Sequence, residues 1–216
     1  MTRKFSRGFT MIELLLVIAV IGVLAAIAYP VFIGILERAK ATKDMNNLRQ
    51  IGIATQLYLN DNDGALFSTA TSWMSQLHQT KYLSSWNVFQ SPFDTRPPSE
   101  LGDVSTPISY GINGTANLVG TSVDKISQPT IFILFAPAQA STATVTFQGT
   151  ALTGLPGVTV LQAASAPGGA ALGGTHSSRR KVNALFADLH LENMEWSVFT
   201  NTPAGSDPSV AQRWTP

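Results

Sequence analysis

The chain has 216 residues, of which 44% are hydrophobic and only 12% are charged, whereas soluble domains carry about 25% charged residues. This length allows one moderate domain plus an appendage, and a membrane segment would account for part of the charge deficit. Without the basic residues Arg3, Lys4 and Arg7, eleven basic and thirteen acidic side chains remain, a balance of −2. That balance argues against a nucleic acid partner, because such proteins need a basic face. Cysteine is absent, so neither disulfide bonds nor thiolate chemistry are available.

The first expected element is an apolar run from Leu14 to Leu36, 23 residues without a formal charge. As a helix it would be about 34 Å long, enough to cross the core of a bilayer. Positive charges precede it, which predicts a cytoplasmic N-terminus and an external C-terminus. Glu13 stands at its leading edge; a charge in such a place usually has a partner, and nothing nearby in the chain supplies one.

Two general explanations fit this run. It can be an ordinary signal anchor, or a removable secretory signal in which Ala26-Ile27-Ala28 precedes the cut and the mature chain starts at Tyr29. Apolar character continues past that cut, from Val31 to Leu36, and a removable signal gives Glu13 no role. The secretory signal is therefore the least favoured explanation.

A third explanation comes from the sequence MTRKFSRGFTMIELLLVIAVIGVLAAIAYP of residues 1–30, which resembles the prepilin signal of type IV pilins and type II secretion pseudopilins. That signal has a short basic leader ending in Gly, then Phe, with Glu as the fifth residue of the mature chain. The resemblance implies a leader of residues 1–8, cleavage by a prepilin peptidase between Gly8 and Phe9, and N-methylation of Phe9. We favour it over the other two explanations.

The same resemblance makes Glu13 an assembly residue. It implies that Glu13 pairs with the new α-amino group of Phe9 in an adjacent subunit and sets the axial register of a filament. A carboxylate and an ammonium buried together are tolerable, whereas either one left alone is costly. Pro30, which pilins also carry at this place, removes a helical hydrogen bond, so we expect a helix kink there.

Residues 37–60 follow as an amphipathic helix. Its apolar stripe has a spacing of three to four residues and consists of Ala41, Met45, Leu48, Ile51 or Gly52, Thr55 and Leu59. The polar residues Lys43, Asp44, Asn47, Arg49 and Gln50 fall mostly off this stripe. The whole helix, from near Phe9 to near Asn60, would contain 52 residues and measure about 78 Å.

The sequence Asp61-Asn62-Asp63-Gly64 ends this helix, and we expect Gly64 in a left-handed conformation. The same residues resemble the opening of a calcium loop, but Ser72 stands where such a loop requires Glu. The helix stop is therefore the favoured interpretation.

The rest of the head is predicted to be one short helix followed by strands, hence an α+β fold with an antiparallel sheet. The helix is expected over Ser72 to Leu83, with Trp73, Leu77 and Met74 turned inward. Strands are expected over Ile108–Asn113, Thr130–Ala136, Ala143–Gln148, Gly157–Gln162, Val182–Ala187 and His190–Trp196. Residues 137–175, rich in Ala, Gly, Ser and Thr, are interpreted as a variable excursion on the head.

Four further segments narrow the resemblance: NNLRQIGIATQLYLNDNDG (46–64), VFQSPFD (88–94), SYGIN (109–113) and HSSRRKVNALFADLHLE (176–192). They are similar to pilin-like proteins abundant in Planctomycetes and Verrucomicrobia, usually labelled type II secretion system protein G or prepilin-type cleavage/methylation domain proteins. Those proteins have Cys-Pro where this chain has Ser91-Pro92. They end on a His, nine residues and Asp-Gly-His, whereas here eleven residues separate His176 from Asp188 and Leu189 replaces the glycine.

A metal centre at His176, Asp188 and His190 is the main alternative to a structural role for the last segment, since imidazole and carboxylate ligands suit zinc. Asp-Leu-His is also what a hairpin turn between two strands would contain, although Leu189 fits poorly wherever a positive φ is required. We favour the turn. The usual sequence signatures of hydrolases, phosphate loops and zinc proteases are missing, so no catalytic residue, cofactor or metal is predicted.

These patterns together predict a structural subunit with a leader (1–8), a transmembrane and assembly helix (9–36) and a periplasmic head (37–216). It would span the inner membrane once, with a cytoplasmic N-terminus, before assembly into a filament. The implied partners are the prepilin peptidase, other pilin or pseudopilin subunits and an inner-membrane assembly platform. Secretion, adhesion and DNA uptake all remain open as the task of the filament. The alternatives are a membrane-anchored binding protein that forms no filament and, third, a soluble secreted hydrolase.

Overall fold

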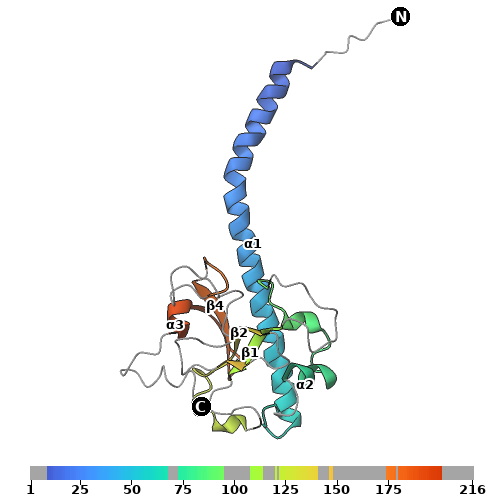
Figure 1. The fold of residues 1–216 in the computed structure, drawn as a ribbon, viewed down its shortest axis with the longest axis vertical. Helices are drawn as coiled ribbons and strands as arrows, with labels where there is room; N and C mark the ends of the chain where they lie inside the picture. Colours follow the sequence, from blue (N-terminus) through green and yellow to red (C-terminus); the bar gives the residue numbers. More distant parts are fainter. Residues whose placement is uncertain are drawn as a thin grey trace, which may run out of the picture. The chain divides into compact units, whose positions relative to one another are not determined.

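The computed structural model describes residues 9–67, 73–94, 108–113, 120, 122–140, 146–147, 174–178 and 180–200. The chain divides into two compact units, an N-terminal helical segment that ends at Ala39 and a head that begins at Lys40. The main elements of the described residues are a long N-terminal helix and a largely antiparallel sheet, which is the α+β arrangement that the sequence predicts (Figure 1). The predicted strand Gly157–Gln162 and most of the predicted excursion lie outside the described residues.

Helix α1 runs from Met11 to Asp61 and is 51 residues long, close to the predicted span. The helix continues without interruption through Pro30. It ends as the sequence predicts: Gly64 has a φ of +74°, and its amide donates a hydrogen bond of 2.9 Å to the carbonyl of Leu59. A residue in the left-handed conformation closes the last turn and satisfies a carbonyl that has no partner inside the helix.

In the head, α1 buries the predicted stripe, including Leu48, Ile51 and Thr55. The expectation that Asp44 and Asn47 fall off this stripe is wrong, because both side chains are buried. Apolar spacing alone treats a polar side chain as exposed, and it cannot anticipate hydrogen-bond donors that arrive from elsewhere in the chain.

The sheet has five strands in the order β3-β1-β2-β4-β5. Their bounds are β1 (Ile108–Asn113), β2 (Ile133–Ala140), β3 (Thr146–Phe147), β4 (Lys181–Phe186) and β5 (Leu191–Glu195). Neighbouring strands from β1 to β5 through β2 and β4 are antiparallel, whereas the two-residue β3 lies parallel to β1. The predicted antiparallel sheet is thus confirmed for four of the five strands.

Several predicted strand ends differ from the structure, and β2 differs most. It begins at Ile133 rather than Thr130, because residues 129–131 form a turn in which the amide of Phe132 bonds to the carbonyl of Gln128 at 3.1 Å. It also continues through Pro137, where the prediction stopped. The pairing of β1 with β2 is irregular between Ile108 and Tyr110, and such an irregularity accommodates a proline that has no amide to donate.

The predicted strands around the last hairpin are one residue off. Strand β4 ends at Phe186 and β5 begins at Leu191, so Ala187 and His190 belong to the turn. Trp196 was expected to end the last strand but instead begins a short helix, α3 (Trp196–Thr200). The Trp196 amide donates to the carbonyl of Arg180 at 2.5 Å, which closes the ladder just where the helix begins.

Helix α2 covers only Trp73–Gln79 instead of the predicted Ser72–Leu83, and residues 68–72 lie outside the described part. The helix stops because Lys81 has a φ of +63° and the amide of Leu83 turns back to the carbonyl of Leu77 at 3.0 Å. This closure resembles the one that glycine usually provides at the end of a helix. The predicted inward residues Trp73, Met74 and Leu77 are buried.

The head has apolar residues packed on both faces of its sheet. The larger cluster joins α1, α2 and the 3-10 helix η1 (Trp86–Phe89) to the sheet, with Ile51, Trp73 and Phe135 among its members. The smaller cluster joins α3 to β4 through Phe199 and Val182. Figure 1 accordingly shows α2 beside the C-terminal part of α1, and α3 next to β4.

Candidate functional site

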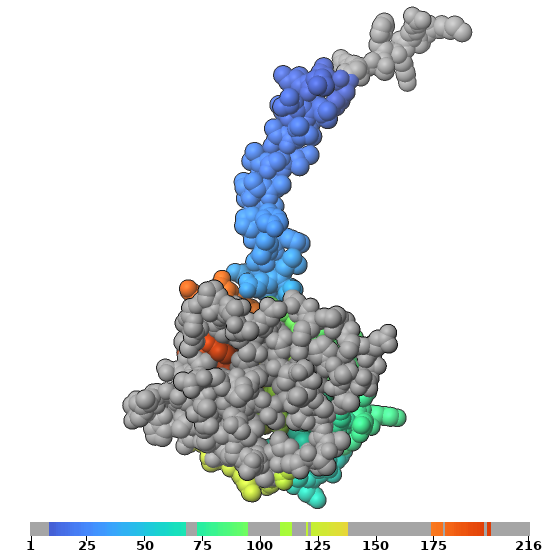
Figure 2. All heavy atoms as spheres, in the orientation of Figure 1, coloured from blue at the N-terminus to red at the C-terminus, as the bar shows by residue number. Residues whose placement is uncertain are grey.

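The first candidate site is the N-terminal part of α1, residues 11–36. Every large hydrophobic side chain described in this stretch is exposed, from Met11 at 82% to Leu36 at 45%. Figure 2 shows the stretch, coloured blue, as an uncovered rod of side chains. Among the described residues, α1 is the one helix with a segment long and apolar enough to cross a membrane. An exposed apolar surface of this extent marks a site of contact with a membrane or with another protein.

Glu13 lies at the start of this rod and forms a capping box with Thr10. The Glu13 carboxylate accepts hydrogen bonds from the Thr10 amide at 2.9 Å and the Thr10 hydroxyl at 2.8 Å. In return the Glu13 amide donates to the Thr10 hydroxyl oxygen at 3.3 Å. This reciprocal pair satisfies amide groups that the first turn of a helix leaves without partners.

The capping box corrects one expectation, that nothing near Glu13 supplies a partner. Thr10 supplies hydrogen bonds, although it supplies no positive charge. The spacing Thr10-x-x-Glu13 ahead of an apolar run is the usual sequence signal for this motif, and the role of Thr10 could have been found from it. Phe9 is 73% exposed, and Gly8 lies outside the described residues.

The second candidate site is a buried polar network in the head, centred on Asp44 of α1. One carboxylate oxygen of Asp44 accepts hydrogen bonds from the Ser91 hydroxyl at 2.5 Å and from the Tyr110 hydroxyl at 2.6 Å. The other accepts from the Asn183 amide at 2.9 Å. The Asn47 side chain, one turn further along α1, donates to the carbonyl of Gln90 at 3.0 Å. These bonds tie α1 to β1, to β4 and to the loop before Asp94.

The network extends from Asn183 towards His176. The Asn183 side-chain oxygen accepts from the Asn193 amide at 2.6 Å, and the same amide lies 2.6 Å from Nε2 of His176. The His176 ring is buried and stacks on Phe93 with 5.6 Å between ring centroids. The network therefore takes in residues from all four segments that narrowed the family resemblance, and these segments meet around one carboxylate.

Burial sets the ionisation of this centre. Loss of water raises the pKa of Asp44 above its ordinary value, while hydrogen bonds from Ser91, Tyr110 and Asn183, and the charge of His176, act in the opposite direction. Burial beside Asp44 also raises the pKa of Tyr110 well above its ordinary value, so its hydroxyl stays a donor. All contacts of the network are internal, and Ser91 is itself buried. These features suit a structural lock between α1 and the sheet rather than catalysis.

The structure does not assemble the alternative metal centre from His176, Asp188 and His190. Asp188 accepts from the amide of His190 at 3.1 Å and lies 2.5 Å from Nδ1 of the same residue, within the β4–β5 hairpin. Leu189 adopts a φ of +70° in this turn, the conformation for which leucine seemed unsuited. Across the described part of the chain, no group of three His, Asp or Glu side chains is placed to share a metal ion. The predicted hairpin turn is confirmed.

The residues of the alternative calcium loop at the end of α1 also have structural roles. Asp61 accepts a hydrogen bond from the hydroxyl of Tyr82, and Asp63 has a φ of +52° beside Gly64. The Asn62 side chain donates to the carbonyl of Tyr58 at 2.8 Å. These residues close the helix and anchor the turn, as the favoured interpretation predicts.

Comparisons with known proteins point to one family. Residues 3–29 match the family model described as the prokaryotic N-terminal methylation motif. The chain is 31% identical to the fimbrial protein EcpC of Eikenella corrodens over 125 residues, 57% of this chain and 80% of that protein. It is 30% identical to the type IV major alpha-pilin of Moraxella bovis over 122 residues, 56% of this chain and 72% of that protein.

A shorter similarity is to a secretion-system protein. It is 34% identical to the type II secretion system core protein G of Pseudomonas aeruginosa over 62 residues, 29% of this chain and 44% of that protein. No solved structure matches the chain. Since the similarity to the Moraxella bovis pilin covers 72% of that protein at 30% identity and the methylation motif is present, the chain belongs to the type IV pilin and type II secretion pseudopilin family.

Proposed function

We propose that this chain is a prepilin that a prepilin peptidase cuts between Gly8 and Phe9, that is N-methylated at Phe9, and that assembles into a pilus-like filament. The filament would serve a type IV pilus or a type II secretion system. The single observation behind this proposal is the exposed apolar rod of residues 11–36, which begins with the capping box of Thr10 and Glu13.

The rod can be covered in two environments. Before assembly a bilayer would surround it, with the N-terminus in the cytoplasm, the head in the periplasm and the inner membrane as the host. After assembly the rods of other pilin or pseudopilin subunits would surround it. A helix that is apolar on all sides suits both environments, whereas an amphipathic helix would suit only one.

The capping box bears on maturation. A cut between Gly8 and Phe9 leaves the amide and the hydroxyl of Thr10 in place, so the first turn of α1 keeps its cap in the mature chain. The new ammonium of Phe9 then lies near the end of an apolar helix, and in a filament it would be withdrawn from water. The Glu13 carboxylate of an adjacent subunit supplies the missing negative charge.

Pro30 would act on the same segment. The missing amide of a proline weakens the helix one turn earlier, so we expect a kink where the rod adapts from bilayer to filament. The inner-membrane assembly platform is the partner expected to drive that transfer.

The test follows the N-terminus and the filament in the same cells. We expect mature protein that begins at N-methylated Phe9 by mass spectrometry, and filaments in the sheared fraction. Gly8→Leu should accumulate uncut, because a bulky side chain replaces the residue that fits the tight protease site, whereas the matched change Arg7→Leu should still be cut.

Two outcomes would contradict the proposal. A functional protein that begins at Tyr29 would show a secretory signal. Correctly cut and inserted protein that forms no filament under any condition would favour a membrane-anchored binding protein instead.

A further inference from the structure

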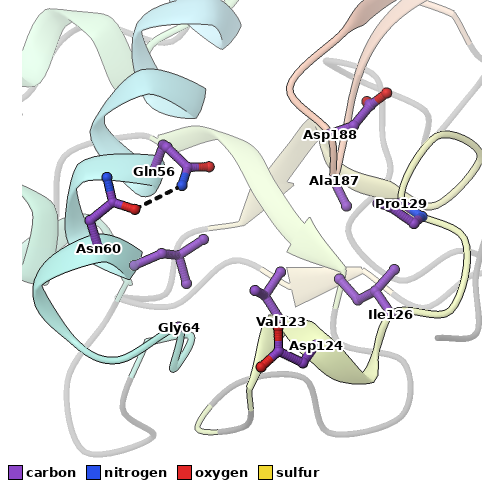
Figure 3. A pocket seen from close by; sticks show the side chains of 10 residues that line it. Gln56, Asn60, Gly64, Val123, Asp124, Ile126, Pro129, Ala187 and Asp188 are labelled. Carbon is purple, nitrogen blue, oxygen red and sulfur yellow. Dashed lines mark hydrogen bonds between the residues drawn. The ribbon is translucent and has the colours of Figure 1, made fainter.

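The head has an open pocket of about 620 Å³ where the end of α1 approaches the 3-10 helix η3 (Val123–Lys125) and the β4–β5 hairpin. Its apolar lining includes Leu59, Val123 and Ile126. Asp124 and Asp188 also line it, but Asp188 is already paired with His190 at 2.5 Å, so Asp124 is the carboxylate available to a partner. Figure 3 shows the two aspartates on opposite sides of the pocket, with Val123 and Ile126 between them. All these residues belong to the head unit.

The residues that line the pocket favour an aliphatic side chain with a positively charged end. A long aliphatic chain that ends in a positive charge matches apolar walls with a carboxylate at the edge, because lysine and arginine bury their stems while the charged end stays near water. Asp124 is exposed, and its own local bond is to the Ser122 hydroxyl at 3.1 Å, so its carboxylate remains accessible. The pocket volume lies within the range of about 300–1,000 Å³ that ligand sites occupy.

We propose that the pocket receives Lys43, with Lys40 beside it, from a second copy of this chain. Both lysines are exposed on α1, and neither forms an ion pair with any part of the chain that the structure describes. Both lysines lie at the N-terminal end of the part of α1 that belongs to the head, whereas the pocket lies at the C-terminal end of α1. Lys43 precedes Asn60, a residue of the pocket lining, by 17 positions, which is about 26 Å along a helix. The lysine therefore cannot enter the pocket of its own chain.

The positions of the pocket and of the two lysines on α1 favour a contact that repeats from copy to copy. Gln56 also lines the pocket and follows Lys43 by 13 residues, so at 3.6 residues per turn the two point in directions roughly 140° apart around α1. A patch at one end that fits a different patch at the other end makes a head-to-tail contact, which continues from copy to copy. A two-fold pair in which each lysine enters the pocket of the other copy would instead close at two subunits and could not continue into a filament.

The surface of α1 between Lys43 and the pocket supports the same head-to-tail contact. Ile53 and Leu57 are 53% and 46% exposed there, although they lie in the part of α1 that packs on the sheet. A second copy displaced along α1 would cover these two side chains while its lysine reaches the pocket. This inference rests on the proposed function, since a filament needs one contact repeated at every subunit.

The chain has no cysteine, so an introduced pair reports contacts between copies without background. The full-length variant Lys43→Cys/Asp124→Cys is produced in cells, and intact filaments are treated with a short bifunctional thiol crosslinker. We expect a ladder of covalent multimers. The single variants should give no ladder, and the control pair Lys43→Cys/Lys81→Cys should give none.

Charge reversal tests the same contact without a crosslinker. Asp124→Lys and Lys43→Glu should each lower the filament yield several-fold, and the double variant Asp124→Lys/Lys43→Glu should restore much of it. The control Lys81→Glu changes the net charge equally and should assemble like the wild type. Equal unfolding temperatures of the variants would show that the loss is one of assembly.

The failures of the two proposals are distinguishable. Wild-type filaments without a ladder, together with normal yields of both single charge variants, would overturn this contact and leave the proposed function intact. Dimers from Asp124→Cys alone would show a two-fold contact and would also overturn it. If the wild-type chain forms no filament, the proposed function fails and this contact fails with it.

Discussion

Tyr110 on β1 donates a hydrogen bond of 2.6 Å to Asp44 on α1, across 66 residues of sequence. Asp44 is fully buried, and its carboxylate is tolerated there because Ser91 and Asn183 donate as well. The donors come from a loop and from two strands, so the network fixes the position of α1 on the sheet.

Tyr110→Phe should lower the free energy of unfolding of the head by about 1–3 kcal/mol, because it removes one donor and leaves a buried carboxylate with fewer partners. The matched control is Tyr82→Phe, which removes a hydroxyl that bonds to exposed Asp61. We expect that change to cost less than about 0.5 kcal/mol. Urea unfolding of both variants gives the comparison, and equal losses would show that the network around Asp44 adds nothing special.

The stability of the head should depend on pH through Asp44, since burial raises the pKa of this carboxyl above its ordinary value of 3.8. A raised pKa means that the native state binds the proton more tightly than the unfolded chain does. The stabilisation is then complete below 3.8 and is lost as the pH rises through the folded pKa.

Asp44→Asn removes this titration. The free energy of unfolding of the wild type, relative to Asp44→Asn, should therefore decrease as the pH rises from about 3.5 through the folded pKa. Urea titrations at several pH values provide the measurement. Parallel profiles for the two proteins, or a relative increase with pH, would contradict the prediction.

Gly52 allows a close approach between α1 and the hairpin. A Cβ atom there would lie 3.0 Å from Cδ2 of Leu185, which is fully buried, and 3.5 Å from Cδ2 of Leu189. Gly52→Leu should therefore cost about 1–3 kcal/mol through overpacking, although leucine is the better helix former. Asn46→Leu, at an exposed position of the same helix, should leave the thermal midpoint nearly unchanged. A Gly52→Leu protein that melts at or above the wild-type temperature would show that the neighbouring leucines can move aside.

Variants of Thr10 and Glu13 distinguish the capping of the helix from the assembly of the filament. Thr10→Val removes the hydroxyl half of the capping box and should cost the helix about 0.5–2 kcal/mol, while the carboxylate and its bond from the backbone amide of residue 10 remain. Glu13→Val keeps that hydroxyl as a cap but removes the carboxylate, which under the proposed pairing leaves the Phe9 ammonium of a neighbouring subunit unpaired in the filament. Both variants should insert and be cut, but only Glu13→Val should lose most of its sheared filaments.

The readout is processing and filament yield in the same cells. Normal filaments from Glu13→Val would remove the assembly role of the carboxylate. Loss of cutting alone would make Glu13 a recognition residue for the peptidase.

A fragment that begins at Lys40 should be a soluble, folded monomer, because the head forms a compact unit with its own core. We expect its melting curve to be unchanged by a chelator, since Asp188 and His190 are occupied with each other within the hairpin. A collapse of the melting transition on addition of chelator would show that a metal ion holds the head together.

Local sequence was sufficient for the features that depend on neighbouring residues. The charge-free run from Leu14 to Leu36 predicts a helix long enough to cross a bilayer, because a helix that is apolar all round needs apolar surroundings on every side. Gly64 predicts the end of α1, since the left-handed conformation there costs glycine least. The capping box of Thr10 and Glu13 was equally readable, because both partners lie within one turn.

Tertiary structure decided the features whose partners lie far away. Asp44 looks like an exposed residue by helical spacing, and it is buried only because Ser91, Tyr110 and Asn183 bring donors to it. Local preference alone disfavours a leucine at positive φ, but the side chain of Leu189 lies next to Gly52 of α1, and packing of that kind can offset a local backbone cost of about 1–2 kcal/mol. Propensity describes only the local part of the free energy, and burial and hydrogen bonding across the sheet outweigh it at these positions.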